Sequence, residues 1–146
     1  TGEPGQRSAL ILASTTQHGM GIVFPCHCYM KSIDVISIPV SNQQVAKAFY
    51  KKLGFVVLEE QKMEEGKYWI RMGLEGSSTT ITLVTWFSKM PPGSMQGLVL
   101  RTDNLQEDIQ LLKKEGILST DPGEAAGGKF ISFKDPDGNG ISLQER

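Results

Sequence analysis

The residues best suited to metal chemistry stand together near the amino terminus. Cys26, His27 and Cys28 carry two thiols and an imidazole, which are donors that zinc prefers. A tetrahedral zinc site needs three or four ligands converging on one ion, and adjacent residues cannot all point at it without distortion of the backbone. The other histidine, His18, lies in the same stretch. The sequence therefore favours a chance cluster, and it predicts no bound metal and no cofactor.

Composition narrows the possible partners. With 146 residues, of which 39% are hydrophobic and 21% charged, the chain is long enough for one compact domain with a buried core. Its formal net charge is −1, with both signs interspersed, so neither nucleic acid nor an anionic membrane is expected as a partner. Two cysteines are too few for a disulfide framework, so a reducing, cytoplasmic location is expected.

The first 29 residues look unlike the rest. From Ser8 to Met30 the chain has no Asp, Glu, Lys or Arg, yet its apolar residues keep no helical or strand period. Polar residues interrupt the stretch, so it predicts neither a transmembrane span nor a secretion signal. We expect residues 1–29 to be a non-native or disordered extension, and residues 30–146 to form the single domain.

The main feature of that domain is an internal repeat. Val40-Ser41-Asn42, an amphipathic run and Gly54 are echoed by Thr102-Asp103-Asn104, a second such run and Gly116. The offset is the same at both ends, since 102 − 40 and 116 − 54 both equal 62. Self-similarity at a fixed period indicates a duplicated unit. Two such half-sheets would face each other across a cleft suited to a small ligand.

Hydrophobic periodicity predicts the elements of each unit. Apolar residues at spacings of three and four, with Asn before them and Gly after them, indicate one helix in each. Alternating apolar residues indicate strands. Each unit is therefore βαβββ, with module one at 31–87, a Pro-rich linker at 88–95 and module two at 96–146. The expected strands span 33–40, 55–60, 68–74 and 79–86 in module one, and 97–102, 117–119, 129–133 and 141–144 in module two.

Two motifs in this arrangement resemble the vicinal oxygen chelate superfamily of glyoxalases, bleomycin-resistance proteins and extradiol dioxygenases. They are the run 48–55, AFYKKLGF, and the run 135–141, DPDGNGI, before the last strand. The likeness covers residues 31–146. It implies an α+β glyoxalase/bleomycin-resistance fold, in which eight strands curl into one U-shaped sheet with the helices outside. Members commonly pair, so the resemblance also implies a homodimer.

The resemblance also says where a metal would bind. Metal-dependent members place four ligands on the floor of the trough, and these positions fall on Val35, Thr82, Gly97 and Ser142. Valine and glycine offer no side-chain donor, and hydroxyls are poor ligands for zinc, nickel or iron. A metal-dependent activity is therefore disfavoured, although the fold is supported.

Strand alternation assigns the faces of the sheet. One set of residues should pack under the helices, and the opposite face should line the trough with small, mixed side chains that suit a neutral or weakly polar organic ligand. Arg101 could clamp an oxyanion or simply reach solvent. The residues expected under the helices are Ile36, Ile38, Ile81, Leu83, Leu98, Leu100, Ile141 and Leu143. The predicted ligand-binding residues are Val35, Ser37, Tyr68, Trp69, Thr82, Trp86, Gly97, Val99, Arg101, Ser142 and Gln144.

Three functions remain open. The first is a metal-free protein that binds a small organic molecule in the trough, with Tyr68, Trp69 and Trp86 as aromatic walls. The alternative is a metal-dependent lyase or dioxygenase, similar to lactoylglutathione lyase, whose metal would need residues such as Asp34, Glu60 or Glu145. The third is a partner-binding scaffold, for which the sequence offers no large apolar helix face.

Overall fold

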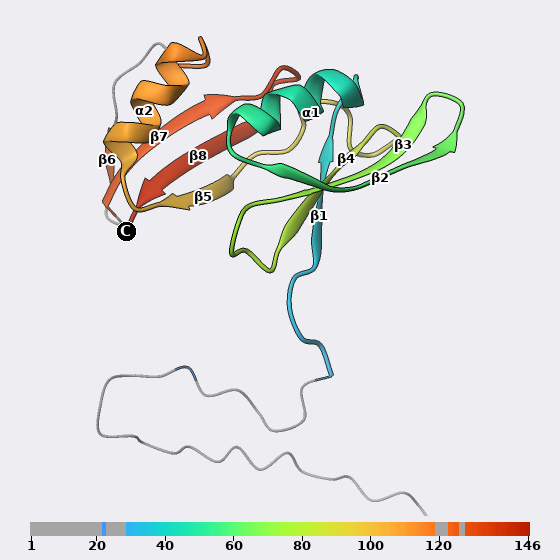
Figure 1. The fold of residues 1–146 in the computed structure, drawn as a ribbon, viewed down its shortest axis with the longest axis horizontal. Helices are drawn as coiled ribbons and strands as arrows, with labels where there is room; N and C mark the ends of the chain where they lie inside the picture. The colour runs from blue at the N-terminus through green and yellow to red at the C-terminus, as the bar shows by residue number, and fades with distance from the viewer. Residues whose placement is uncertain (1–21, 23–28, 119–122, 126–127) are drawn as a thin grey trace, which may run out of the picture. The chain divides into compact units, whose positions relative to one another are not determined.

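The computed structural model describes residues 22, 29–118, 123–125 and 128–146. The chain separates into two units, Thr1–Ser32 and Ile33–Arg146, and the fold below is that of the second (Figure 1). Most of the expected extension at 1–29, including Cys26, His27 and Cys28, lies outside the described residues, so that expectation stays a prediction. No helix in the described ranges is long and apolar enough to cross a membrane.

The first module forms a four-stranded sheet, called sheet A, with one helix. Its strands lie in the order β1-β4-β3-β2, with β1 parallel to β4 and the other neighbours antiparallel. Helix α1 packs on β3 and β4. The elements are β1 (Val35–Pro39), α1 (Gln43–Lys52), β2 (Val56–Glu64), β3 (Lys67–Gly73) and β4 (Thr80–Val84).

The second module repeats this topology as sheet B, in the order β5-β8-β7-β6 (Figure 1). The α+β class and the tandem βαβββ modules are thus as expected. A single curled sheet of eight strands is not confirmed, because the described strands pair only within their own module. The elements are β5 (Leu98–Thr102), α2 (Leu105–Lys114), β6 (Gly123–Ala125), β7 (Gly128–Lys134) and β8 (Gly140–Glu145).

Both helices begin and end as the repeat predicts. The Asn42 side chain accepts hydrogen bonds from the backbone N–H groups of Gln44 and Val45, and Asn104 accepts one from Glu107. Gly54 and Gly116 follow the helices with φ of 97° and 71°, a left-handed conformation that favours glycine. The duplicated unit is therefore a capped helix in both modules.

The predicted strand at 117–119 is wrong where the structure describes it. The backbone N–H groups of Ile117 and Leu118 both donate to the carbonyl of Leu112, at 2.8 and 3.3 Å. These amides complete the end of α2, so they are not available to a β-ladder. The second strand of module two is instead β6, at Gly123–Ala125. In module one, β4 ends at Val84 instead of Trp86, and β2 runs on to Glu64.

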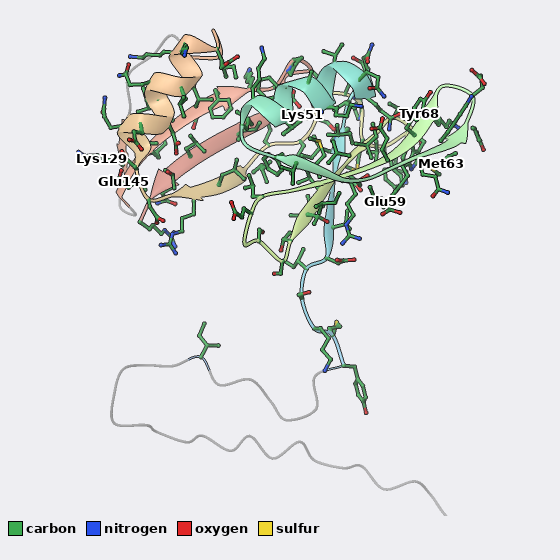
Figure 2. The ribbon with its side chains drawn as sticks, viewed as in Figure 1. Lys51, Glu59, Met63, Tyr68, Lys129 and Glu145 are labelled. Atoms are coloured by element: carbon green, nitrogen blue, oxygen red, sulfur yellow. The ribbon has the colours of Figure 1, made fainter. Side chains whose placement is uncertain are left out.

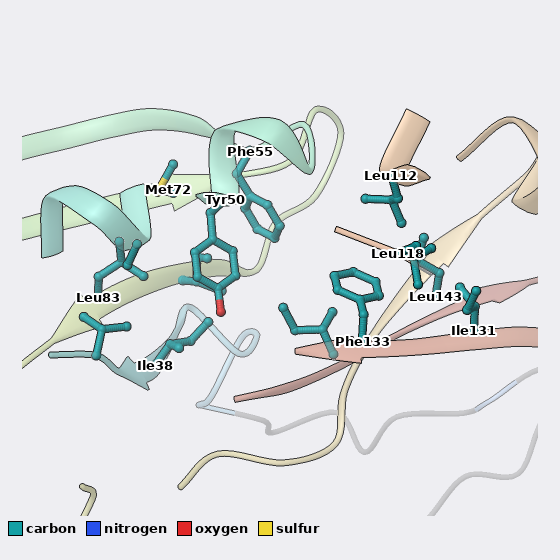
Figure 3. Close-up of a cluster of buried hydrophobic side chains, with 14 of the residues drawn as sticks. Ile38, Tyr50, Phe55, Met72, Leu83, Leu112, Leu118, Ile131, Phe133 and Leu143 are labelled. Carbon is teal, nitrogen blue, oxygen red and sulfur yellow. The ribbon is translucent and has the colours of Figure 1, made fainter. Parts of the chain in front are cut away.

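One hydrophobic core joins the helix-facing sides of the two sheets (Figure 3). Five of the eight residues expected under the helices are buried, and Leu98 and Leu100 are half-buried and pack against the core. Phe55 from module one and Phe133 from module two are both members. The buried five are Ile38, Ile81, Leu83, Ile141 and Leu143.

A buried carboxylate connects the modules through this core. The Tyr50 hydroxyl of α1 donates to Asp135 Oδ2 at 2.9 Å, and the Asn139 side-chain amide donates to the same oxygen at 2.7 Å. Asp135 Oδ1 accepts from the backbone N–H groups of Asp137 and Asn139, each at 2.9 Å. The Asn139 amide also donates to the carbonyl of Pro39 at 2.8 Å. The DPDGNG motif of module two is therefore hydrogen-bonded to module one.

This arrangement favours the neutral form of the Tyr50 phenol. The side chain is fully buried. Burial and the neighbouring Asp135 carboxylate raise the pKa of Tyr50 far above its usual range. The raised pKa means that the contribution of Tyr50 to stability is complete below pH 10, its ordinary value, and is lost as the pH rises.

The Tyr50→Phe variant tests this coupling. At neutral pH we expect it to unfold with about 1 kcal/mol less free energy than the wild type, because one buried hydrogen bond is gone. Above about pH 10 the wild type should lose up to about 1.4 kcal/mol per pH unit more than the variant, so the two stability curves should cross near about pH 11. Urea unfolding at a series of pH values measures both curves, and parallel curves would contradict the coupling.

Candidate functional site

Each sheet has one side away from its helix, and we call this side the helix-free face. Strand alternation places Ile38 and Leu83 on the helix side of sheet A and Ile131 and Leu143 on the helix side of sheet B, where all four are buried. The residues between them in sequence therefore point to the helix-free faces. These two faces are where the sequence predicts the ligand-binding residues.

On sheet A the structure brings several of the predicted residues together. Ser37 lies opposite Thr82 across β1 and β4, and Val35 lies opposite Thr80 on the same face. Arg71 of β3 lies opposite Thr82, and Trp69 shares its face two residues earlier. Val35, Ser37, Trp69 and Thr82 therefore lie on one face of sheet A, and their role in ligand binding stays a prediction.

Two further residues of this face were missed by the sequence analysis. Glu59 of β2 lies opposite Arg71, and its carboxylate accepts a hydrogen bond from Trp69 Nε1 at 3.0 Å. Arg71 is identifiable from its alternation with Trp69. Glu59 is not, because a register shift between Val57 and Glu59 breaks the count along β2. The face is thus more charged than the sequence analysis expected.

Hydrogen bonds within sheet A occupy two of its hydroxyls. Thr82 is 1% exposed, and its hydroxyl donates to the carbonyl of Ile70 at 2.8 Å. Thr80 donates to the carbonyl of Asp34 and accepts from Arg71 Nε, both at 2.9 Å. Arg71 Nη2 pairs with Asp34 at 2.6 Å. Thr82 therefore shapes this face without presenting a donor to it.

On sheet B the predicted residues also fall on one face. Val99 lies opposite Ser142, and Arg101 lies opposite Gln144. The Ser142 hydroxyl is 2.8 Å from that of Ser132 on β7, which the sequence analysis did not single out. A hollow of about 230 Å³ lies here, and its lining includes Gln96, Gly97, Ser132, Lys134, Gly140 and Ser142.

The predicted aromatic walls are not brought together. Tyr68 lies on the helix side of sheet A and packs against the core, while Glu59 lies on the other side of the same hairpin (Figure 2). The backbone of Tyr68 also exchanges two hydrogen bonds with the buried Gln43 side chain. Trp86 lies beyond the end of β4 and packs on Phe87, with ring centroids 6.1 Å apart. Trp69 is the one predicted aromatic residue on a helix-free face.

A cleft of about 740 Å³ lies between the two modules. Its apolar walls include Ile36 and Ile81 from sheet A and Leu98 and Leu100 from sheet B. Arg101 also lines this cleft, and its guanidinium pairs with Asp103 at 3.1 Å. Both partners are largely exposed, at 70% and 87% of their side chains, so this ion pair is a weak one that a ligand can displace.

The residues at the family's metal positions do not suit a metal. Val35 and Gly97 have no side-chain donor, and the hydroxyls of Thr82 and Ser142 are engaged with Ile70 and Ser132. Within the described ranges, no three His, Cys, Asp or Glu residues are grouped closely enough to hold an ion. The chemistry of these side chains offers no site for zinc, nickel or iron.

The three carboxylates named for the alternative activity are dispersed and engaged. Asp34 pairs with Arg71, and Glu145 accepts a hydrogen bond from the backbone N–H of Leu105 at 2.7 Å, at the start of α2. Glu60 lies on the helix side of sheet A and pairs with Lys47 at 3.0 Å. Hydrogen bonds from Lys47 and Gln44 lower the pKa of Glu60. No two of these three carboxylates converge on one point where they could share a metal ion.

Comparison with known proteins gives one family. The family model described as "Glyoxalase/Bleomycin resistance protein/Dioxygenase superfamily" matches residues 32–143. An uncharacterized protein, YetH of Bacillus subtilis (strain 168), is 29% identical over 121 residues, which are 80% of this chain and 99% of that protein.

Two solved structures are also similar. The antibiotic binding protein TnmS3 from Streptomyces sp. CB03234 is 38% identical, with a TM-score of 0.76 over 82% of this chain and 98% of that one. A glyoxalase/bleomycin resistance protein from the same strain is 40% identical, with a TM-score of 0.69 over 77% of this chain and 99% of that one.

The Thr82→Val variant tests the structural role of the Thr82 hydroxyl. We expect it to lower the free energy of unfolding by about 1–2 kcal/mol, because a buried hydrogen bond to Ile70 is lost. Its repeat counterpart gives the control, since Ser142 is half-buried and Ser142→Ala should cost less than about 0.5 kcal/mol. Denaturant titration compares the two variants, and equal small losses would contradict a structural role for the Thr82 hydroxyl.

Proposed function

The chain belongs to the Glyoxalase/Bleomycin resistance protein/Dioxygenase superfamily, and on that premise we propose that it binds a small organic ligand without a metal ion. The ligand lies in a trough lined by the helix-free faces of sheets A and B. The protein holds this molecule and does not transform it. Its proposed location is the cytoplasm, because the chain has only two cysteines.

One observation carries this proposal. The four positions that would hold a metal are Val35, Thr82, Gly97 and Ser142, and none supplies an imidazole, thiolate or carboxylate. A lyase or dioxygenase of this superfamily would need such donors to polarise its substrate. A protein that only sequesters its ligand needs none.

Similarity to an antibiotic-binding protein supports the class of ligand. TnmS3 binds an antibiotic, by its description, and the present chain resembles it over most of both proteins. We extend this to an organic molecule of antibiotic size. Fold similarity alone does not establish function, so the side chains that line the trough must also be compatible with such a ligand.

The side chains of sheet A are compatible with such a ligand. Trp69 presents an indole that a planar ring can stack on, and its N–H is held by Glu59. Val35 adds apolar surface at the other end of the same face, and Arg71 supplies a guanidinium that is held by Asp34 and Thr80. An aromatic, mostly apolar molecule with a few polar groups matches this surface.

A second copy of the chain would complete the trough. Strands β1 and β5 lie at the edges of their sheets, and neither has a second neighbour in the described chain. An unpaired edge is a template for another strand. Pairing of β1 with β5 of a second copy would join the helix-free face of sheet A in one copy to that of sheet B in the other. It would also cover the apolar walls of the cleft between the modules.

A thermal-shift screen against antibiotics and aromatic metabolites tests the binding function. A ligand present at 100 times its Kd should raise the stability by about 2.7 kcal/mol. The rise should persist after treatment with EDTA, because no metal takes part. Loss of the rise on chelation would contradict the proposal and favour a metal-dependent lyase or dioxygenase.

Two tryptophan variants locate the ligand that the screen identifies. Trp69→Phe should weaken its binding, whereas Trp86→Phe, which changes the same type of side chain outside the helix-free face, should not. Titration calorimetry gives both affinities. Equal effects would place the ligand elsewhere.

Light scattering tests the assembly. We expect a mass of twice the 16.0 kDa of one chain, because a second copy would cover the edge strands β1 and β5 and the apolar cleft. Measurement over a dilution series separates a weak dimer from a monomer. A mass of one chain at every concentration would contradict a trough shared between copies.

A further inference from the structure

We propose that the hollow on sheet B, lined by Gly97, Ser132, Lys134, Gly140 and Ser142, binds the anionic end of the ligand. This inference rests on the proposed binding function and specifies the ligand as an organic acid, such as an aromatic carboxylate. Its aromatic part lies along the trough, and its carboxylate oxygens enter the hollow. No covalent step is involved.

The shape of the hollow follows from two neighbouring glycines. Gly140 lies opposite Lys134 on β7, and Gly97 precedes β5 beside it, because the next pair along is Leu98 with Ile141. Gly97 has no side chain to fill the space, whereas over Gly140 the side-chain amide of Gln96 takes the place that a Cβ would occupy. A Cβ placed on Gly97 would meet nothing within 4 Å, so the surface above it is open. A small group can therefore approach the backbone at Gly97.

Hydrogen-bond donors stand on the rim of this space. The Ser132 and Ser142 hydroxyls are 2.8 Å apart and face each other across β7 and β8. One hydroxyl donates to the other, so the second can turn its proton toward a bound oxygen. Lys134 shares the face of Ser132 two residues along the strand, and its ammonium has three donors.

The charge of this face is positive. By register and alternation it carries Lys134 near one end and Arg101, which pairs with Asp103, toward the other. None of its strand positions on β5, β7 and β8 is acidic. Glu145 lies on the helix side, where it caps α2. The strand positions on this face are 99, 101, 130, 132, 134, 140, 142 and 144. A charge-assisted hydrogen bond from an ammonium to a carboxylate is the strong contact available here.

The hollow also coincides with the metal positions of module two. Gly97 and Ser142 are the two positions at which a metal-dependent relative would need ligands, and both line this space. A carboxylate at either position would repel an organic acid. Glycine and serine remove that repulsion, and Lys134 supplies a positive charge at the same place.

A pair of isosteric probes tests the inference on the full-length protein. The probes are 2-naphthoate and its neutral amide, 2-naphthamide, titrated with detection by backbone amide chemical shifts. We expect 2-naphthoate to bind at least about tenfold more tightly, with shifts at Gly97, Gly140 and Ser142. The preference for the acid should weaken as salt is added.

Two lysines on the same strand give a matched pair of variants. Lys134→Met should remove the preference for the acid and leave the affinity for the amide nearly unchanged. Lys129→Met makes the same change of charge on the opposite face of β7 and should keep the preference. Both side chains are exposed, so neither variant should fail to fold.

The outcomes separate this inference from the function on which it rests. Equal affinities for acid and amide, equal effects of the two lysine variants, or shifts that avoid the hollow would each overturn the anion site while binding in the trough still stands. Absence of binding by both probes would also overturn it. A screen in which no antibiotic or metabolite raises the melting temperature would instead overturn the binding function itself.

Discussion

The Asp135 carboxylate is the group on which the arrangement of the two modules depends. A buried carboxylate costs several kcal/mol unless it is fully hydrogen-bonded. Here its oxygens accept from Tyr50 of module one and from Asn139 and Asp137 of its own turn. Three of these four hydrogen bonds lie within the turn, and the fourth, from Tyr50, joins the turn to module one and so helps to orient β8 and the helix-free face of sheet B.

The two helices could be predicted from the sequence because their signals are local. Each helix is defined by an Asn cap, an apolar stripe and a Gly, and these act over a few residues. The second strand of module two was misplaced because Ile117 and Leu118 are residue types common in strands, whereas their backbone amides donate to the end of α2. The predicted aromatic walls do not form for a different reason. Tyr68 and Trp69 are adjacent in one strand, so their side chains must face opposite sides of the sheet.

The sequence predicted which faces carry the candidate site better than it predicted which polar groups on those faces remain available. Alternation placed Val35, Ser37 and Thr82 on one face and Val99, Arg101 and Ser142 on another, and the registers agree. Which polar groups remain available depends on cross-strand partners that alternation does not supply. Thr82 is engaged with Ile70, and Lys134 lies beside Gly140 only because of the β7–β8 register. The sequence therefore located both faces but missed the residues that give them charge.

The polar junction also breaks the symmetry of the duplication. The repeat counterpart of Tyr50 is Leu112, since 112 − 50 is 62, and this leucine is buried in the core without a hydroxyl to offer. Whatever ancestral half-protein gave rise to both modules, the descendants have become complementary instead of interchangeable. A chimaera built from two identical first halves would lack Asp135 and Asn139 and so lose this junction, whereas a circular permutant that keeps both halves would retain it.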